Sequence, residues 1–348
     1  MTDSNQTIKA GLASGQIRER LAALGNNQST ILVGVMILLI IVFSSLEPKF
    51  LSVATANNIL TDWGSVVLIA VGQTFVVISG GIDLSVGAVI GLSGVVSAWT
   101  MANVLGIDQS VKGSDSYGPL LIGGAVSVGV GLLVGLVNAF LINKFKIVPF
   151  IATLATMGAC LGFSVILSNG MPIGSGNDFK LISAMAPKSN PLSWAVLAVA
   201  IIVTIAGLYM HKSRFGLYTF AIGSNTFAAR GAGINVERHI TKVYALSGAL
   251  AGLAGIYVYI RLGAGSPTNG AGMELYAIAA TVIGGASLMG GVGRIVGVAL
   301  GTLVLFTVQS GLLMVKVVTV SPSLKQVIVA ILIAAAVAVQ TLQKPGRK

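Results

Sequence analysis

Long apolar runs recur along almost the whole chain, and this recurrence limits what the chain can fold into. Ten such runs are separated by short polar segments. Most approach the roughly 20 residues that an α-helix needs to cross a bilayer. Only 9% of the residues are charged, against roughly 25% in soluble domains. The sequence therefore predicts an all-α integral membrane protein, a polytopic bundle of about ten transmembrane helices.

The ten predicted spans form a single transmembrane domain, residues 30–342, because no loop between them is long enough to fold alone. Residues 1–29 are predicted to be a cytoplasmic tail or an interfacial helix, and residues 343–348 a cytoplasmic tail. The eighth and tenth spans are short. The spans are 30–46, 63–82, 84–105, 119–142, 147–167, 192–210, 243–260, 275–289, 295–314 and 327–342.

The distribution of Lys and Arg predicts how the bundle is oriented. With both termini in the cytoplasm, 14 of the 21 basic residues fall in cytoplasmic segments, as the positive-inside rule expects. The net charge of +11 is then explained by membrane orientation, and we expect no nucleic-acid partner. Lipid surrounds the spans.

The polar loop at residues 211–242 carries five basic residues against one acid, so we place it in the cytoplasm. Ser224 or Asn225 can cap a short helix that begins at Thr226, because their side chains accept from free backbone N–H groups. Gly231 and Gly233 would end that helix. Asn235 can cap the next helix. A short capped helix between two spans is suited to binding a partner, although an ordinary loop explains the pattern equally well.

Asp83 is the most informative single residue, since it lies between two long apolar runs. An acid at the bilayer centre would cost about 2.5–3.5 kcal/mol. Gly80 and Gly81 can end one helix, and Asp83 or Ser85 can cap the next. Asp83 is therefore either a helix cap in a tight cytoplasmic turn or a residue of the translocation path or its gate.

Other polar residues in or beside the spans are candidates for the same path, although each can equally hydrogen-bond a neighbouring helix. With Asp83, the candidates are Ser85, Gln73, Asn138, Thr153 and Glu274.

Neither catalytic nor metal-binding residues are predicted. The chain lacks a phosphate-binding G-x-x-x-x-G-K-[ST] segment, and its two histidines, His211 and His239, are too far apart for the usual metal spacings. The single cysteine, Cys160, is expected to pack inside a span. Glycines four residues apart, as in Gly131/Gly135 and Gly87/Gly91, predict close helix contacts.

Two segments resemble the permease subunits of bacterial ATP-binding-cassette sugar importers of the ribose type. FAIGSNTFAARGAGINVER (residues 220–238) resembles their cytoplasmic coupling motif, and SGGIDLSVG (residues 79–87) resembles another characteristic segment. The similarity covers roughly residues 47–342. Phe227 and Tyr276 depart from the family, which usually has Glu and Asp there.

The resemblance implies that the coupling motif docks on an ATPase subunit. The matching residues assigned to this ATPase-coupling loop are Arg214, Gly223, Asn225, Ala228, Ala229, Arg230, Gly233 and Ile234. The chain itself would bind no cofactor, because the partner ATPase uses the ATP.

The resemblance further implies a multi-pass protein of the bacterial inner membrane that translocates a monosaccharide, a pentose or hexose, by alternating access. The expected partners are the ATPase, a periplasmic sugar-binding protein and a second permease subunit, most simply a second copy of this chain. Two alternatives remain open. One is a permease of the same machinery for nucleosides or branched-chain amino acids, and the other is an ion-coupled secondary sugar carrier.

Overall fold

The computed structural model describes residues 28–106, 118–174, 193–314, 327 and 330–331. Within them, eight helices are long and apolar enough to cross a membrane, which confirms the all-α membrane class. These are α2 (Gln28–Leu46), α3 (Val53–Ile78), α4 (Val86–Trp99, continued by the π-helical turn η2, Thr100–Val104), α5 (Gly118–Lys144), α6 (Pro149–Ser168), α8 (Trp194–Lys212), α11 (Val236–Leu262) and α13 (Ile295–Met314).

Shorter elements connect these helices. They are η1 (Pro48–Leu51), β1 (Ile173–Gly174), α9 (Arg214–Ser224), α10 (Thr226–Gly231), β2 (Ala264–Gly265) and α12 (Met273–Ile283). Strands β1 and β2 pair antiparallel, with Ile173 opposite Gly265.

Eight of the ten predicted spans correspond to these long helices. The eighth prediction, residues 275–289, is instead the 11-residue helix α12 followed by an irregular loop. The chain leaves the helix at Gly284 because Gly285 adopts a φ of +95°, which L-residues with side chains rarely tolerate. The predicted tenth span and both predicted tails lie almost entirely outside the described residues, so the count of ten and the orientation of the termini stay predictions.

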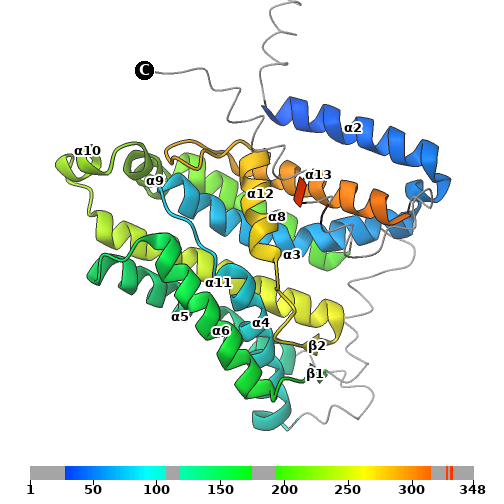
Figure 1. The fold of residues 1–348 in the computed structure, drawn as a ribbon, viewed down its shortest axis with the longest axis horizontal. Coiled ribbons are helices and arrows are strands. Elements are labelled where there is room, and N and C mark those ends of the chain that lie inside the picture. Colours follow the sequence, from blue (N-terminus) through cyan, green and yellow to red (C-terminus); the bar gives the residue numbers. More distant parts are fainter. Residues whose placement is uncertain (1–27, 107–117, 175–192, 315–326, 328–329, 332–348) are drawn as a thin grey trace, which may run out of the picture.

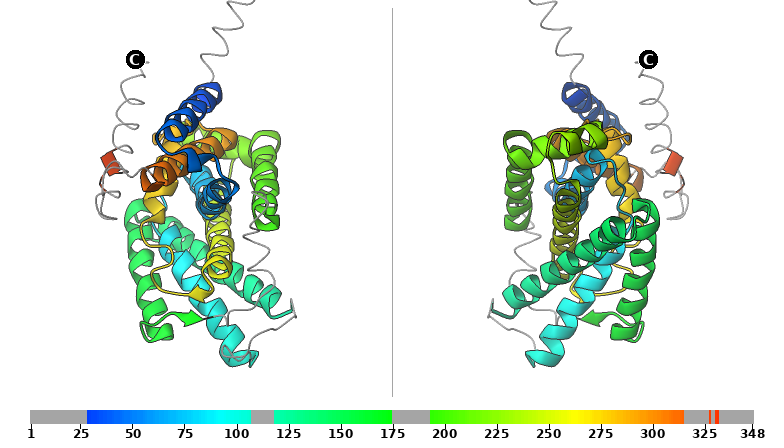
Figure 2. Two further views of the ribbon diagram at one scale, coloured as in Figure 1. Left: turned by 90° about the vertical axis from the view of Figure 1, so that its right-hand side faces the viewer. Right: turned by 90° about the vertical axis from the view of Figure 1, so that its left-hand side faces the viewer.

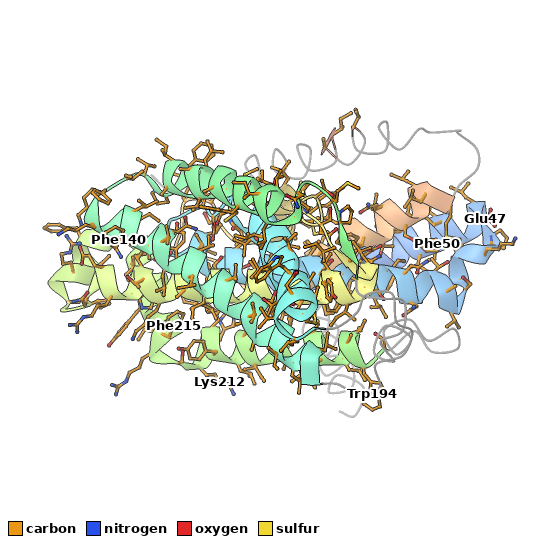
Figure 3. All side chains as sticks on the ribbon, turned by 90° about the horizontal axis from the view of Figure 1, so that it is seen from below. Glu47, Phe50, Phe140, Trp194, Lys212 and Phe215 are labelled. Carbon is orange, nitrogen blue, oxygen red and sulfur yellow. The ribbon has the colours of Figure 1, made fainter. Side chains whose placement is uncertain are left out.

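Helices α3 and α11 run through the middle of the molecule, with α10 at one end (Figure 1). The side chains of Phe140, Lys212 and Phe215 lie toward that end, and those of Glu47, Phe50 and Trp194 lie toward the other (Figure 3). Helix α8, from Trp194 to Lys212, therefore runs in the direction that joins these two ends of the molecule.

Glycines bring α5 and α11 into backbone contact. A Cβ on Gly131 of α5 would overlap the carbonyl oxygen of Gly248 on α11, and one on Gly252 would overlap that of Ser127. Close helix contact of this kind is favoured in membranes. The predicted role of the Gly131/Gly135 pattern is confirmed.

The prediction for Gly87/Gly91 holds only in part, because Gly87 faces Glu274 of helix α12 but both glycines also face an irregular segment. This segment, residues 263–272 between α11 and α12, we name the re-entrant segment. Its Gly270 lies beside Gly87, and its Pro267 carbonyl oxygen lies 2.7 Å from where a Cβ on Gly91 would be.

Helix α2 lies at the edge of the bundle, over α13 and far from α4 (Figure 2). Only 11% of the residues in its apolar 18-residue stretch are buried inside the protein. It is held at one end by Gln28, whose Nε2 donates to the Ile283 carbonyl oxygen (2.7 Å). Near its other end, Phe43 packs on Gly311 of α13.

Candidate functional site

Asp83 lies in the link between α3 and α4, residues 79–85, and its side chain is 1% exposed. Its Oδ1 accepts from the Ser85 backbone N–H (3.0 Å) and from the Ser85 hydroxyl (2.6 Å). Its Oδ2 accepts from the Ser247 hydroxyl on α11 (3.0 Å). Both carboxylate oxygens are therefore bonded, as a buried acid requires.

The hydrogen bonds continue from Asp83 to two more helices. Asn138 Nδ2 on α5 donates to the Ser85 hydroxyl (2.9 Å), and Asn138 Oδ1 accepts from the Thr156 hydroxyl on α6 (2.6 Å). Thr153, one turn earlier on α6, donates to the Ile82 carbonyl oxygen (3.3 Å). The link is thereby joined to α5 and α6.

Gln73 of α3 bonds the backbone of Asp83. In the amide orientation that satisfies both of its polar atoms, Nε2 donates to the Asp83 carbonyl oxygen (2.9 Å) and Oε1 accepts from the Asp83 N–H (3.2 Å). These two hydrogen bonds satisfy the backbone N–H and carbonyl groups of Asp83, which the non-helical link does not pair within itself. An irregular segment among membrane helices needs such partners.

Five of the six residues predicted for the path therefore meet in one cluster, which we call the Asp83 network. The sixth, Glu274 at the start of α12, lies apart from it beside Gly87, and its Oε2 has no hydrogen-bond partner among the described residues. The residues of the Asp83 network are Gln73, Asp83, Ser85, Asn138, Thr153, Thr156 and Ser247.

The cap hypothesis for Asp83 is wrong in its simple form. The capping position of α4 is Ser85, whose side chain makes no cap bond, and Asp83 bonds Ser85 itself rather than a first-turn N–H of the helix. The predicted end of α3 is confirmed: Gly80 has a φ of +88°, and Gly81 N–H donates to Val76 O (2.9 Å). Asp83 therefore ties the link to α11.

Ser247 was not among the predicted site residues. Thr156 lies one turn after Thr153 on α6, which is a signal that places both on one helix face. Ser247 stands directly before Gly248, and a serine in a small-residue stretch carries no local sign of its partner.

The predicted cytoplasmic loop is mostly helical, and two of its predicted caps are confirmed. Asn225 Oδ1 accepts from Ala228 N–H (2.9 Å) at the start of α10, and Asn235 Oδ1 accepts from Arg238 N–H (2.9 Å) at the start of α11. Helix α10 ends before Gly233, whose φ is +84°. Helix α9 before it was not predicted, although Ser213 is a cap residue and accepts from Gly216 N–H (3.2 Å).

A small apolar cluster holds α10 against its neighbours. Ala229 of α10 is buried with Ile222 of α9 and Val236 of α11, and Ile234 packs against them. Helix α9 is fixed to α11 by a hydrogen bond between the Thr219 hydroxyl and His239 Nε2 (2.8 Å). Helices α9 and α10 thus form one structured unit, which we call the α9–α10 unit.

The α9–α10 unit presents most of the other predicted coupling residues to solvent. Phe227 is 89% exposed, which is unusual for a large aromatic side chain. The arginine of α10, Arg230, donates to Glu237 Oε1 (2.6 Å), and Lys146 approaches the same oxygen (3.6 Å). The exposed members of the predicted set are Arg214, Asn225, Ala228, Arg230 and Gly233.

Gly223 is the predicted coupling residue that contacts the end of α3. A Cβ there would overlap the carbonyl oxygen of Ile78, the last residue of α3, and would lie 2.7 Å from the Gly291 nitrogen. Gly291 N–H itself donates to Ile78 O (2.9 Å). The end of α9 and the end of α3 are therefore in backbone contact.

Comparisons with known proteins agree with this architecture. The family described as "Branched-chain amino acid transport system / permease component" matches residues 55–337. The ribose import permease protein RbsC of Escherichia coli (strain K12) is 36% identical over 283 residues, covering 80% of this chain and 83% of that protein. RbsC of Bacillus subtilis (strain 168) is 39% identical over 280 residues, covering 80% and 82%. The D-allose transport system permease protein AlsC of Escherichia coli (strain K12) is 35% identical over 309 residues, covering 88% and 90%. With a family match over most of its length and relatives of this identity, the chain belongs to the permease components of ATP-binding-cassette importers, in the branched-chain amino acid transport system family.

Proposed function

We propose that this chain carries a monosaccharide across the bacterial inner membrane, in a complex with an ATPase, a periplasmic binding protein and a second permease subunit. Relatives at 31–39% identity are named for ribose, allose and galactose. The polar side chains buried among the helices are mostly hydroxyls and amides, and the one acid of the Asp83 network is fully bonded. Such an interior suits a neutral solute better than a zwitterionic amino acid, which would need charged partners.

The observation that carries the coupling role is the backbone contact between Gly223 and Ile78. A displacement of α10 is transmitted to α9 through the buried cluster of Ala229, Ile222 and Val236. The end of α9 rests on Ile78, and the chain continues from there into the link that holds Asp83. Contiguous packed elements of this kind can transmit a displacement.

Phe227 is proposed as the apolar anchor of the docking surface. It lies at the start of α10 and is 89% exposed, so its side chain contributes little to the stability of this chain. Aromatic side chains buried at an interface are typical hot spots, and truncating one costs roughly 2 kcal/mol or more of binding. The proposed partner surface is an apolar groove on the ATPase.

We expect Phe227→Ala to leave the amount of protein in the membrane unchanged and to reduce sugar-stimulated ATP hydrolysis by the assembled complex. Met171→Ala, at a residue 68% exposed after α6, is the matched control and should hydrolyse ATP normally. Full ATP hydrolysis and uptake in Phe227→Ala would contradict the docking role.

The substrate class is tested in proteoliposomes that contain the whole complex with its binding protein. We expect ATP-dependent uptake of one of ribose, allose or galactose, maintained when the proton gradient is dissipated. Uptake of leucine or a nucleoside in place of every sugar would reject the monosaccharide proposal. Uptake that stops with the gradient while ATP is maintained would reject ATP coupling.

A further inference from the structure

The re-entrant segment runs back along α4 inside the depth of the membrane. From the end of α11 its Gly265 lies against Gly94, its Pro267 against Gly91 and its Gly270 against Gly87. Helix α4 belongs to the membrane-spanning stretch Val86–Val104. The re-entrant segment passes the third, second and first turns of α4 in this order. It must therefore enter the same layer of the membrane as α4.

The segment has no regular backbone structure beyond the two residues of β2, yet its fold is well defined. Asn269 Nδ2 donates to Ala264 O (2.8 Å), and Asn269 N–H donates to Ser266 O (3.1 Å). The hydroxyls of Ser266 and Thr268 lie 3.0 Å apart. These bonds form a compact turn whose polar groups sit at its tip.

One face of this turn is covered by α4 and the other is open. Pro267 and Gly270 are buried, Ser266 and Asn269 are partly exposed, and Thr268 is exposed. Behind the turn lies Glu274, which is buried beside Gly87. The open face therefore carries hydroxyl and amide groups.

Lipid cannot cover this face, because irregular backbone at membrane depth is tolerated only where it is buried in protein or lines a water-filled cavity. An exposed threonine on a regular membrane-spanning helix behaves differently, as Thr204 shows on α8. Thr204 is also exposed, but its hydroxyl donates to Ala200 O of its own regular helix (2.8 Å). Thr204 thus provides an internal comparison for Thr268.

We propose that the open face of the re-entrant segment lines the water-filled passage and that the Thr268 hydroxyl, with Asn269 and Ser266 beside it, contacts the hydroxyl groups of the transported sugar. This inference rests on the proposed function for the nature of the solute. No residue from 263 to 272 is charged, which suits a neutral polyhydroxylated solute whose recognition needs donors and acceptors. The Asp83 network, which is buried, holds the helices behind this surface.

The test compares Thr268→Cys with Thr204→Cys in a Cys160→Ser background. A membrane-impermeant thiol reagent is added to intact cells that express the whole complex. The reactive species is the thiolate, which forms in water and not in an apolar surrounding, so we expect Thr268→Cys to react at least about tenfold faster than Thr204→Cys. Sugar under transport conditions should slow the reaction at Thr268→Cys only.

A second variant removes the hydroxyl and keeps the shape. Thr268→Val should slow sugar uptake by roughly 2- to 12-fold, the factor that one neutral hydrogen bond is worth, while the amount of protein in the membrane stays normal. Thr204→Val is the control and should transport normally.

Three outcomes would overturn the proposal. Equal labelling of the two cysteines would place Thr268 away from water. Disulfide-linked dimers of Thr268→Cys, with labelling that sugar does not slow, would place it at an interface between two copies. Normal uptake by Thr268→Val would remove it from substrate contact. If the Cys160→Ser parent takes up no monosaccharide, the proposed function fails instead, and the comparison of the two cysteines still decides whether the segment faces water.

Discussion

At the scale of single residues, the carboxylate of Asp83 is the group on which three buried hydrogen bonds converge. Three donors share its two oxygens, and through Ser85 it connects to Asn138 and Thr156. A buried donor that loses its acceptor costs about 1–3 kcal/mol. The network is thus stable only while the acceptor at position 83 is kept.

Asp83→Ala should lower the free energy of unfolding by several kcal/mol, because Ser85 and Ser247 lose their acceptor. Asp83→Asn keeps one oxygen for Ser85, and its amide group can donate to the Ser247 hydroxyl, so we expect a loss of only about 1 kcal/mol. Thermal unfolding in detergent and the amount of protein in the membrane measure both. If Asp83→Asn is inserted and folded normally but does not transport, the charge of Asp83 belongs to the mechanism as well as to the fold.

At the scale of the helices, the contact between α5 and α11 is closer than side chains would permit. Gly131 and Gly248 face each other backbone to backbone, and the Ser127 hydroxyl donates to the Gly252 carbonyl oxygen (2.8 Å). Backbone atoms cannot move aside as side chains can. We therefore infer that α5 and α11 shift as one body during transport.

Gly131→Ala should destabilise the protein by roughly 1–3 kcal/mol, the usual cost of overpacking, because its Cβ would overlap Gly248 O. Gly129→Ala on the same helix meets nothing within 4 Å and should be neutral or stabilising by up to about 1 kcal/mol, since alanine favours helix. Unfolding temperatures of the two variants in the same detergent provide the measurement. A Gly131→Ala protein as stable as Gly129→Ala would show that the helices can separate without loss.

Local signals in the sequence predicted some elements well and failed for others. The caps of α10 and α11 were predictable because Asn225 and Asn235 bond residues only three positions away. The short length of α12 was not, since apolar residues continue past Gly285 and only the backbone conformation there reveals the turn.

Packing across long sequence distances explains the remaining differences. Ser247 bonds Asp83 across 164 residues, and no local pattern predicts such a pair. Five residues of the Asp83 network were nevertheless singled out from the sequence, because polar residues are rare inside apolar runs. Glu274 lies apart from this cluster, beside Gly87, because rarity identifies such a residue but does not place it.

At the scale of the whole molecule, the orientation of the bundle decides which surface meets which partner. Ala232 after α10 and Met171 after α6 are both exposed. In a Cys160→Ser background, external impermeant maleimide should label Met171→Cys in intact cells and Ala232→Cys only after permeabilisation. Labelling of both from outside would reject a cytoplasmic α9–α10 unit and, with it, the proposed docking surface.

The attachment of α2 has a consequence for how the protein is made. This helix emerges from the ribosome before every other described span, yet the carbonyl oxygen that Gln28 bonds belongs to a residue 255 positions later. At about 5–20 residues per second, that partner is synthesised roughly 13 to 51 s after Gln28. Helix α2 therefore waits in the bilayer, apolar on nearly all sides, until α13 is delivered beside it. Its composition suits that interval, since a helix that must remain alone in lipid can carry no charged face.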